Sequence, residues 1–219
     1  MAVFRATAGP GADFYIINSA TSTVSYVEWG TTGDVPVIGD YDGDTKSDVG
    51  LFRPSTGSWW IIKSSGGTII TTFGFSTDLP IVADFDADMK TDIAIYRPTT
   101  GQWLGSYSGG GGSINIVFGA PGDKPVPGDY DGDSADDFAV FHPSTGTWQI
   151  YQSNTGTVAN IPFGLSTDIP VPGDYDGDGR DDQAIYRNGV WWLNRSSTGV
   201  ATGAFGLSSD TPVPTKYIP

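Results

Sequence analysis

Four short segments of this chain place aspartates at a spacing that suits a divalent cation. In each segment the order is Asp, an aromatic residue, Asp, Gly or Ala, Asp and, four positions later, one more Asp. The sixteen aspartates are Asp40, Asp42, Asp44, Asp48, Asp84, Asp86, Asp88, Asp92, Asp129, Asp131, Asp133, Asp137, Asp174, Asp176, Asp178 and Asp182. A hard cation such as Ca²⁺ binds about six to eight oxygen ligands, and carboxylates at loop positions 1, 3 and 5 can supply them. The spacing therefore predicts four calcium-binding loops.

The other loop positions fit the same chemistry. A main-chain carbonyl is the ligand at position 7 of such loops, so the side chain there is free to vary. Position 7 is Lys46, Lys90, Ala135 or Arg180, and the aspartate at position 9 adds a fourth carboxylate. Position 4 is Gly in three loops, where the chain has to bend tightly between ligands. Ala87 in the second loop predicts a weaker or distorted site.

Aspartate and glycine also mark ordinary turns, which is the alternative explanation of any single loop of this kind. Four copies are harder to explain in that way, because carboxylates crowded within nine residues repel one another unless a cation neutralises them. Mg²⁺ fits less well, since it gives up its water ligands reluctantly. We therefore expect Ca²⁺, about four ions per chain, and a metal-free chain that is looser or unfolded.

Few titratable groups remain outside this pattern. Of the 25 acidic residues, 18 lie in the four loops and five more precede a recurring Pro strand. Asp13 and Glu28 fall outside both groups, and solvated positions explain them better than an acid/base pair does. His142, the single histidine, replaces the arginine of the other repeat copies, so a structural substitution is the simpler interpretation. We expect no catalytic residues and no enzyme activity.

The loops belong to a repeat that covers nearly the whole chain. An Asp-x-Pro-apolar segment occurs five times, at steps of 44, 45, 45 and 42 residues, each time after an aromatic-Gly pair. An apolar-aromatic-basic triplet and a turn then lead into a strand with an aromatic at its front, at Phe14, Trp59, Trp103, Trp148 and Trp191. A period of this length indicates stacked or radial units, with these aromatics in the core between them.

Each repeat is predicted to form four strands. In the copy at 78–119 we expect strands at 79–83, 92–97, 102–107 and 114–118, with turn residues between them. Four strands in about 45 residues is the size of one propeller blade. The repeat units are about 34–74, 78–119, 123–164 and 168–206, and the closing blade combines 210–219 with 2–30. We predict an all-β, five-bladed β-propeller of four-stranded blades, a single domain over 1–219, whose C-terminal strand closes the ring by joining the N-terminal blade.

Composition excludes several classes of partner. The formal charge of −14, with only 11 Lys and Arg, disfavours nucleic acid, because phosphate binding requires a basic surface. No apolar stretch of roughly 20 residues and no leader-like segment is visible, so we expect no membrane insertion. The chain has no cysteine, which excludes disulfides without fixing the compartment.

The joined Asp-Tyr-Asp-Gly-Asp loops, Phe-Gly pairs and Val-Pro strands resemble the FG-GAP/VCBS-type repeats of integrin α-subunit propellers and secreted bacterial proteins. The resemblance implies a propeller with calcium in the loop between the first and second strands of each blade, held by the sixteen aspartates. The fifth copy departs from the pattern, because Lys216 stands where the first Asp would be, and no calcium is expected there. Members of this family serve in adhesion, protein contact and carbohydrate recognition, so the ligand stays open.

Three functions are consistent with these observations. The first is an extracellular or cell-surface recognition or adhesion module whose loops are stabilised by Ca²⁺ and whose partner is a protein or a carbohydrate. The second is a lectin with repeated sugar sites between blades; Trp60 and Trp192 could stack on sugars if exposed, although we expect buried packing. The third is a polysaccharide-active enzyme, or the non-catalytic appendage of one, in which Asp13, Glu28 or His142 would act.

Overall fold

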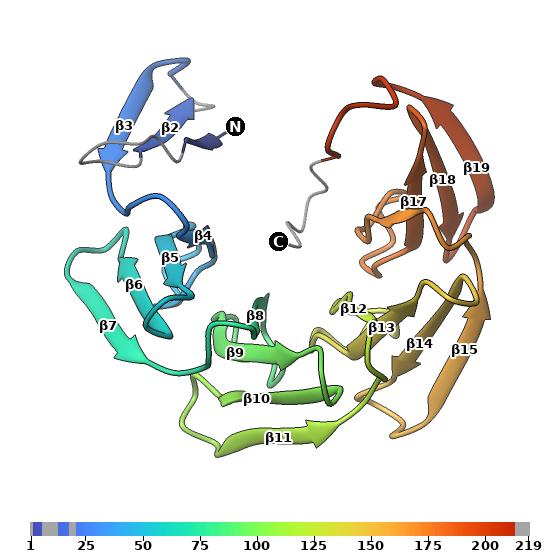
Figure 1. Ribbon diagram of the computed structural model, residues 1–219, viewed down its shortest axis with the longest axis horizontal. Helices are drawn as coiled ribbons and strands as arrows, with labels where there is room; N and C mark the ends of the chain where they lie inside the picture. Colours follow the sequence, from blue (N-terminus) through green and yellow to red (C-terminus); the bar gives the residue numbers. More distant parts are fainter. Residues whose placement is uncertain (1, 6–12, 18–20, 213–219) are drawn as a thin grey trace. The chain divides into compact units, whose positions relative to one another are not determined.

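The computed structural model describes residues 2–5, 13–17 and 21–212, and its fold is an all-β, five-bladed propeller with mostly four-stranded blades. Each blade is one antiparallel sheet in which strands adjacent in the chain are neighbours, as Figure 1 shows. No helix in the described part of the chain is long and apolar enough to cross a membrane. The five antiparallel sheets confirm the predicted all-β propeller.

The chain divides into two compact units, Met1–Pro80 and Ile81–Ile218. The first unit contains a sheet of β1 (Ala2–Arg5), β2 (Asp13–Ile17) and β3 (Val24–Glu28), and a sheet of β4 (Val35–Pro36), β5 (Val49–Arg53), β6 (Ser58–Ile62) and β7 (Thr68–Thr72). The boundary falls inside β8. The prediction of a single domain over 1–219 stays a prediction, as does the ring closure by a C-terminal strand, because residues 213–219 lie outside the described part.

The second unit contains three four-stranded sheets. They are β8 (Leu79–Ala83), β9 (Asp92–Arg97), β10 (Gln102–Ser106) and β11 (Ser113–Val117); β12 (Lys124–Pro125), β13 (Phe138–His142), β14 (Thr147–Tyr151) and β15 (Val158–Pro162); and β16 (Ile169–Pro170), β17 (Gln183–Arg187), β18 (Val190–Arg195) and β19 (Gly199–Ala204). The four strands expected in the copy at 78–119 agree with β8 to β11 to within one residue. The Asp loops join the first and second strands of their blades.

Alternation of side chains along the strands builds the core. In β6, β10 and β14 the second and fourth residues are buried and their neighbours are more exposed, as expected when one sheet face is fully covered. Trp148 of β14 packs in one cluster with Phe141 and with Ile185 of the next blade. The predicted core between blades is therefore present in the second unit.

The repeated tryptophan also bonds the third strand of its blade to the residue that follows the fourth strand. Trp103 is fully buried, and its indole N–H donates to the carbonyl of Phe118 at 2.9 Å; the corresponding bonds join Trp59 to Phe73, Trp148 to Phe163 and Trp191 to Phe205. Next to this bond, a Cβ on Gly57 would lie 2.2 Å from the carbonyl oxygen of Gly74. The turn glycine and the aromatic-Gly pair therefore recur together because the backbone approaches itself closely there.

The basic residue of the triplet, at the end of the second strand, binds the aspartate that precedes the first strand. The Arg53 guanidinium donates two hydrogen bonds of 2.9 Å to Asp34, and Arg187 binds Asp168 in the same bidentate way. His142 Nδ1 lies 2.6 Å from Asp123 Oδ1, so the histidine takes the place of the arginine. The structural interpretation of His142 agrees with this arrangement.

Candidate metal centres

Each Asp loop gathers three carboxylates. One oxygen from each of Asp40, Asp42 and Asp48 lies within 4.8 Å of the other two. Within the same distance limit the other groups are Asp84, Asp86 and Asp92; Asp129, Asp131 and Asp133; and Asp174, Asp176 and Asp182. Three groups thus combine loop positions 1, 3 and 9, and the third loop combines positions 1, 3 and 5.

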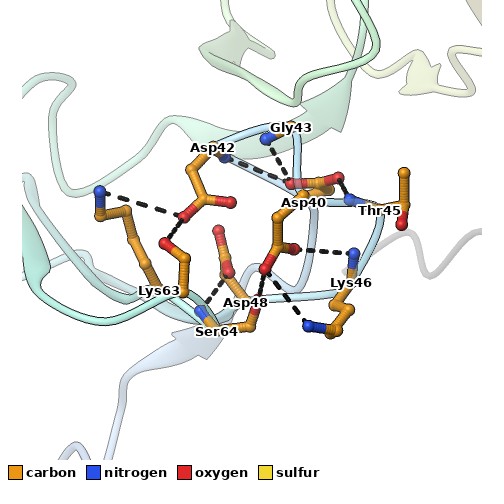
Figure 2. A network of polar contacts seen from close by, with 10 residues as sticks. Asp40, Asp42, Gly43, Thr45, Lys46, Asp48, Lys63 and Ser64 are labelled. Carbon is orange, nitrogen blue, oxygen red and sulfur yellow. Dashed lines mark hydrogen bonds and ion pairs between the residues drawn. The ribbon is translucent and has the colours of Figure 1, made fainter.

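The aspartate at position 1 organises its loop. Asp40 accepts backbone N–H bonds from Gly43 and Thr45, both at 2.7 Å, and a longer one from Asp42 at 3.3 Å. In Figure 2 these dashed lines converge on the Asp40 carboxylate. Asp129 and Asp174 receive the same bonds from positions 4 and 6 of their own loops. The loop backbone is therefore wrapped around its first carboxylate.

This wrapping requires left-handed backbone at positions 4 and 6. At position 4, φ is +81° for Gly43, +83° for Gly132 and +77° for Gly177, which glycine adopts without steric cost. Ala87 stands in the same conformation at φ +57°. Position 6 is also left-handed in every loop, at Thr45, Met89, Ser134 and Gly179. The predicted tight bend is present, and in the second loop an alanine makes it under strain.

The aspartate at position 9 is buried and held from two sides. Asp48 is 1 % exposed; its Oδ2 accepts the N–H of Tyr41 at 2.9 Å and its Oδ1 accepts the N–H of Ser64 at 2.7 Å. Asp92, Asp137 and Asp182 have the same two kinds of donor. Burial raises the pKa of Asp92 and of Asp137 to about 6, although these N–H bonds oppose the shift. A nearby cation would favour the charged form of these carboxylates.

A serine that the sequence analysis did not single out lies over each loop. It comes from the hairpin between the third and fourth strands, and its hydroxyl donates to the aspartate at position 5. The pairs are Ser64 with Asp44, Ser108 with Asp88, Ser153 with Asp133 and Ser196 with Asp178. The bond from Ser64 lowers the pKa of Asp44. These serines recur at the period of the repeat, and this recurrence could have identified them from the sequence.

The position-5 aspartates face the hairpin serines, and their role as ligands stays a prediction. Asp44, Asp88 and Asp178 lie outside the three-carboxylate groups of their loops and face the hairpin serine. In the third loop Asp133 belongs to the group and Asp137 does not. At position 7, the N–H groups of Lys46, Lys90, Ala135 and Arg180 each donate to the position-5 carboxylate of their own loop. The ligand role of the position-7 carbonyls stays a prediction.

In the first, third and fourth loops, one oxygen of the position-3 carboxylate accepts hydrogen bonds and the other has no donor. Asp42 Oδ2 accepts the Ser65 hydroxyl, Asp131 Oδ2 accepts the N–H of Asn154, and Asp176 Oδ2 is bound by Ser197 and Thr198. The Oδ1 atoms of Asp42, Asp131 and Asp176 are buried and have no hydrogen-bond partner among the described residues. A buried carboxylate oxygen without a donor is costly, so these atoms fit a site that a cation completes.

Two lysine side chains lie near the carboxylates of the first loop. Lys63 Nζ lies 4.0 Å from Asp42 Oδ2, and a dashed line joins the two side chains in Figure 2. Lys46 Nζ lies 3.7 Å from Asp44 Oδ2. Lys46 is 72 % exposed at its side chain, so solvent screens its pair. Two lysines do not neutralise four aspartates.

The other candidate residues lie elsewhere. Asp13 and Glu28 occupy paired positions of β2 and β3. Trp192 is 37 % exposed, contrary to the expectation of burial, and the Arg187 guanidinium lies 5.4 Å from its ring centroid. Trp60 has the same relation to Arg53 at 5.3 Å. Among the described residues, these side chains belong to none of the four carboxylate groups.

Comparison with known proteins gives a fold and no family. No protein-family model matches the sequence, and no curated protein matches it. The structure is similar to virginiamycin B lyase from Staphylococcus aureus, with a TM-score of 0.56 and 9 % identity over 89 % of this chain and 64 % of the lyase chain. It is also similar to an Agrocybe aegerita lectin that recognises non-reducing terminal N-acetylglucosamine, with a TM-score of 0.56 and 16 % identity over 90 % of this chain and 60 % of the lectin. This chain thus spans less than two thirds of either chain, and the likeness concerns the fold.

Proposed function

We propose that this chain is a calcium-binding propeller of FG-GAP/VCBS type, in which Ca²⁺ stabilises the blade loops of an extracellular recognition or adhesion module. The observation that carries the proposal is the buried, unpartnered Oδ1 of Asp42, Asp131 and Asp176. Each of these atoms belongs to a carboxylate grouped with those at position 1 and at position 9 or 5. A turn held together by hydrogen bonds alone would have no reason to bury an unpaired oxygen three times.

The chemistry of the donor set favours calcium. All candidate ligands are oxygens: the carboxylates at positions 1, 3, 5 and 9 and the carbonyl at position 7 of each loop. Hard dications prefer such ligands, and Ca²⁺ accepts a larger and less regular set than Mg²⁺ does. When bound, the ion supplies positive charge that offsets the crowded carboxylates, and four ions would add eight positive charges to a chain of formal charge −14.

The residues of the chain perform the remaining tasks. The carboxylate at position 1 holds the turn, the one at position 9 links the loop to the hairpin, and the hairpin serine orients the one at position 5. The bonds at position 1 lie within the loop, and those from the serine fasten the loop to the hairpin between the third and fourth strands of its own blade. Loading the loops would therefore stiffen the four blades that carry them, and no step of this function requires a reacting group.

A recognition role is favoured over catalysis by the use of the titratable groups. His142 is engaged with Asp123 where the repeat has an Arg–Asp pair, and the loop carboxylates are bound to backbone donors. We propose a protein or carbohydrate partner outside the cell, where calcium is abundant; extracellular modules bind Ca²⁺ with Kd of about 10⁻⁴ to 10⁻³ M.

A lectin is the second candidate, and the exposed Trp192 favours it. Trp192 is 37 % exposed, with the Arg187 guanidinium over its ring, and an exposed aromatic side chain can pack against a sugar. A glycan array tests this candidate: binding that Trp192→Ala abolishes without changing the melting temperature supports it, and binding unaffected by that change opposes it.

Thermal unfolding with chelator and with calcium, combined with metal stoichiometry, tests the main proposal. At 1 mM Ca²⁺ and the affinities given above, each site contributes roughly 0.4 to 1.4 kcal/mol. For a chain of this size four sites should raise Tm by about 3 °C or more. The triple variant Asp42→Asn, Asp131→Asn, Asp176→Asn should lose three ions, whereas Asp210→Asn, whose carboxylate serves a separate turn, should lose none. A Tm that ignores calcium, with no bound metal, would refute the proposal.

A further inference from the structure

Asp136 connects two loops of the second unit. It directly precedes the position-9 aspartate of the third loop, yet its partner is the second loop. Asp136 Oδ2 accepts the N–H of Asp84 at 2.9 Å, and the N–H of Asp136 donates to the carbonyl of Asp84 at 2.6 Å. Both peptide groups that flank Asp84, the position-1 aspartate, are therefore held by the next blade.

Asp181 repeats this contact one blade further on. Its Oδ2 accepts the N–H of Asp129 at 3.1 Å and its N–H donates to the carbonyl of Asp129 at 2.6 Å. Asp181 is 7 % exposed, and Gly128 makes room for it, because a Cβ there would lie 2.4 Å from Asp181 Oδ2. A Cβ on Gly132 would likewise lie 2.8 Å from Arg180 Nε. The fourth loop thus packs closely against the third.

We infer that Asp136 and Asp181 are positioning residues that couple the metal site of one blade to the site of the preceding blade. The inference rests on the proposed calcium function. Asp84 and Asp129 are the carboxylates around which their loops are wrapped, so fixing their backbone fixes the loop. Asp136 and Asp181 are in turn adjacent to Asp137 and Asp182, which are buried and bonded to their own loops.

The coupling acts through backbone order. A cation in the fourth loop holds Asp182 and therefore its neighbour Asp181, which presents the first ligand of the third loop. The corresponding path from the third loop to the second runs through Asp137 and Asp136, and there it requires Asp137 as a ligand beyond the group of three. Coupling between sites is reciprocal and typically amounts to about 5- to 150-fold in affinity. The three sites of this unit should therefore fill cooperatively, with a coupling of at least about fivefold between neighbours.

Two glycine amides report the sites separately. The N–H of Gly132 donates to Asp129 Oδ1 and that of Gly177 donates to Asp174 Oδ1, both at 2.6 Å. Calcium titrations of the full chain, followed by NMR at these amides, give an affinity for the third and the fourth site. The cycle compares wild type, Asp176→Asn, which disables the fourth site, Asp181→Ala, and the double variant. Asp210→Ala is the matched control, because its carboxylate accepts a backbone N–H in a turn outside the loops.

The inference predicts that Asp176→Asn weakens the third site at least about fivefold in the wild-type background and has no such effect when Asp181 is alanine. A third site that is indifferent to Asp176→Asn would overturn the coupling, while calcium shifts at Gly132 would still uphold the metal function. If neither glycine responds to calcium, the proposed function fails and the inference with it. Should Asp181→Ala not fold, Asp181→Thr takes its place in the cycle, since Thr91 occupies the same position in the second loop.

Discussion

Exchanging one alanine and one glycine between two loops tests whether the left-handed bend limits stability. Ala87 and Gly177 occupy position 4 of their loops at φ +57° and +77°. Both are exposed, and a Cβ on Gly177 would meet nothing within 4 Å. Ala87→Gly and Gly177→Ala therefore change the backbone preference while removing or adding almost no side-chain packing.

The expected magnitude follows from two opposed terms. A left-handed conformation costs a non-glycine residue roughly 1–2 kcal/mol. Glycine avoids this cost, but it destabilises the protein by about 0.4–1 kcal/mol because it raises the conformational entropy of the unfolded chain. Ala87→Gly should thus raise the free energy of unfolding by about 1 kcal/mol, and Gly177→Ala should lower it by the same amount. For a chain of 219 residues this corresponds to a Tm change of about 2–4 °C in each direction.

Unfolding by heat and by urea in the presence of chelator measures the backbone term without metal. Repeating both in calcium shows whether the relaxed second loop also gains affinity. Gly132→Ala is the informative comparison, because a Cβ there would lie 2.8 Å from Arg180 Nε and should cost more than Gly177→Ala does. If Ala87→Gly and Gly177→Ala shift stability in the same direction, or not at all, the strain argument is wrong.

Three further outcomes are expected. Ser153→Ala removes one hydroxyl bond to the third loop and keeps the backbone bond, so it should cost about 1 kcal/mol by urea denaturation and weaken that site in a calcium titration; an unchanged site would contradict the role of the serine. Trp103→Phe leaves the Phe118 carbonyl without its donor and opens a cavity, so it should cost about 2–3 kcal/mol, far more than a change at an exposed position. In chelator, Asp92 and Asp137 bind protons more tightly in the folded protein, where their pKa is raised to about 6. Their protonated forms therefore stabilise the fold at low pH, and this contribution is lost as pH rises through 6. The urea concentration at the unfolding midpoint should decrease when pH is raised from about 5 to about 7.5, and an increase would contradict the reasoning.

Local patterns explain why much of the fold was predictable. Strand alternation and turn residues act within a few positions of the chain, so β8 to β11 could be placed from the sequence to within one residue. The requirement for a bend at loop position 4 is equally local, and Ala87 indeed adopts the left-handed conformation there. The hairpin serines also recur at the repeat period, and comparison of the copies at that position would have revealed them.

The sequence by itself determined the blade period, the all-β class and the four acidic loops, because these depend on residue types and on spacings within one repeat. Only the tertiary structure decided which carboxylate oxygens are buried without a donor, and that the position-5 aspartates of all four loops face a serine. Only the tertiary structure joined Asp136 to Asp84 and Asp181 to Asp129, which are 52 positions apart. A carboxylate at a loop end can serve its own loop or its neighbour, and the packing of adjacent blades is what selects between them.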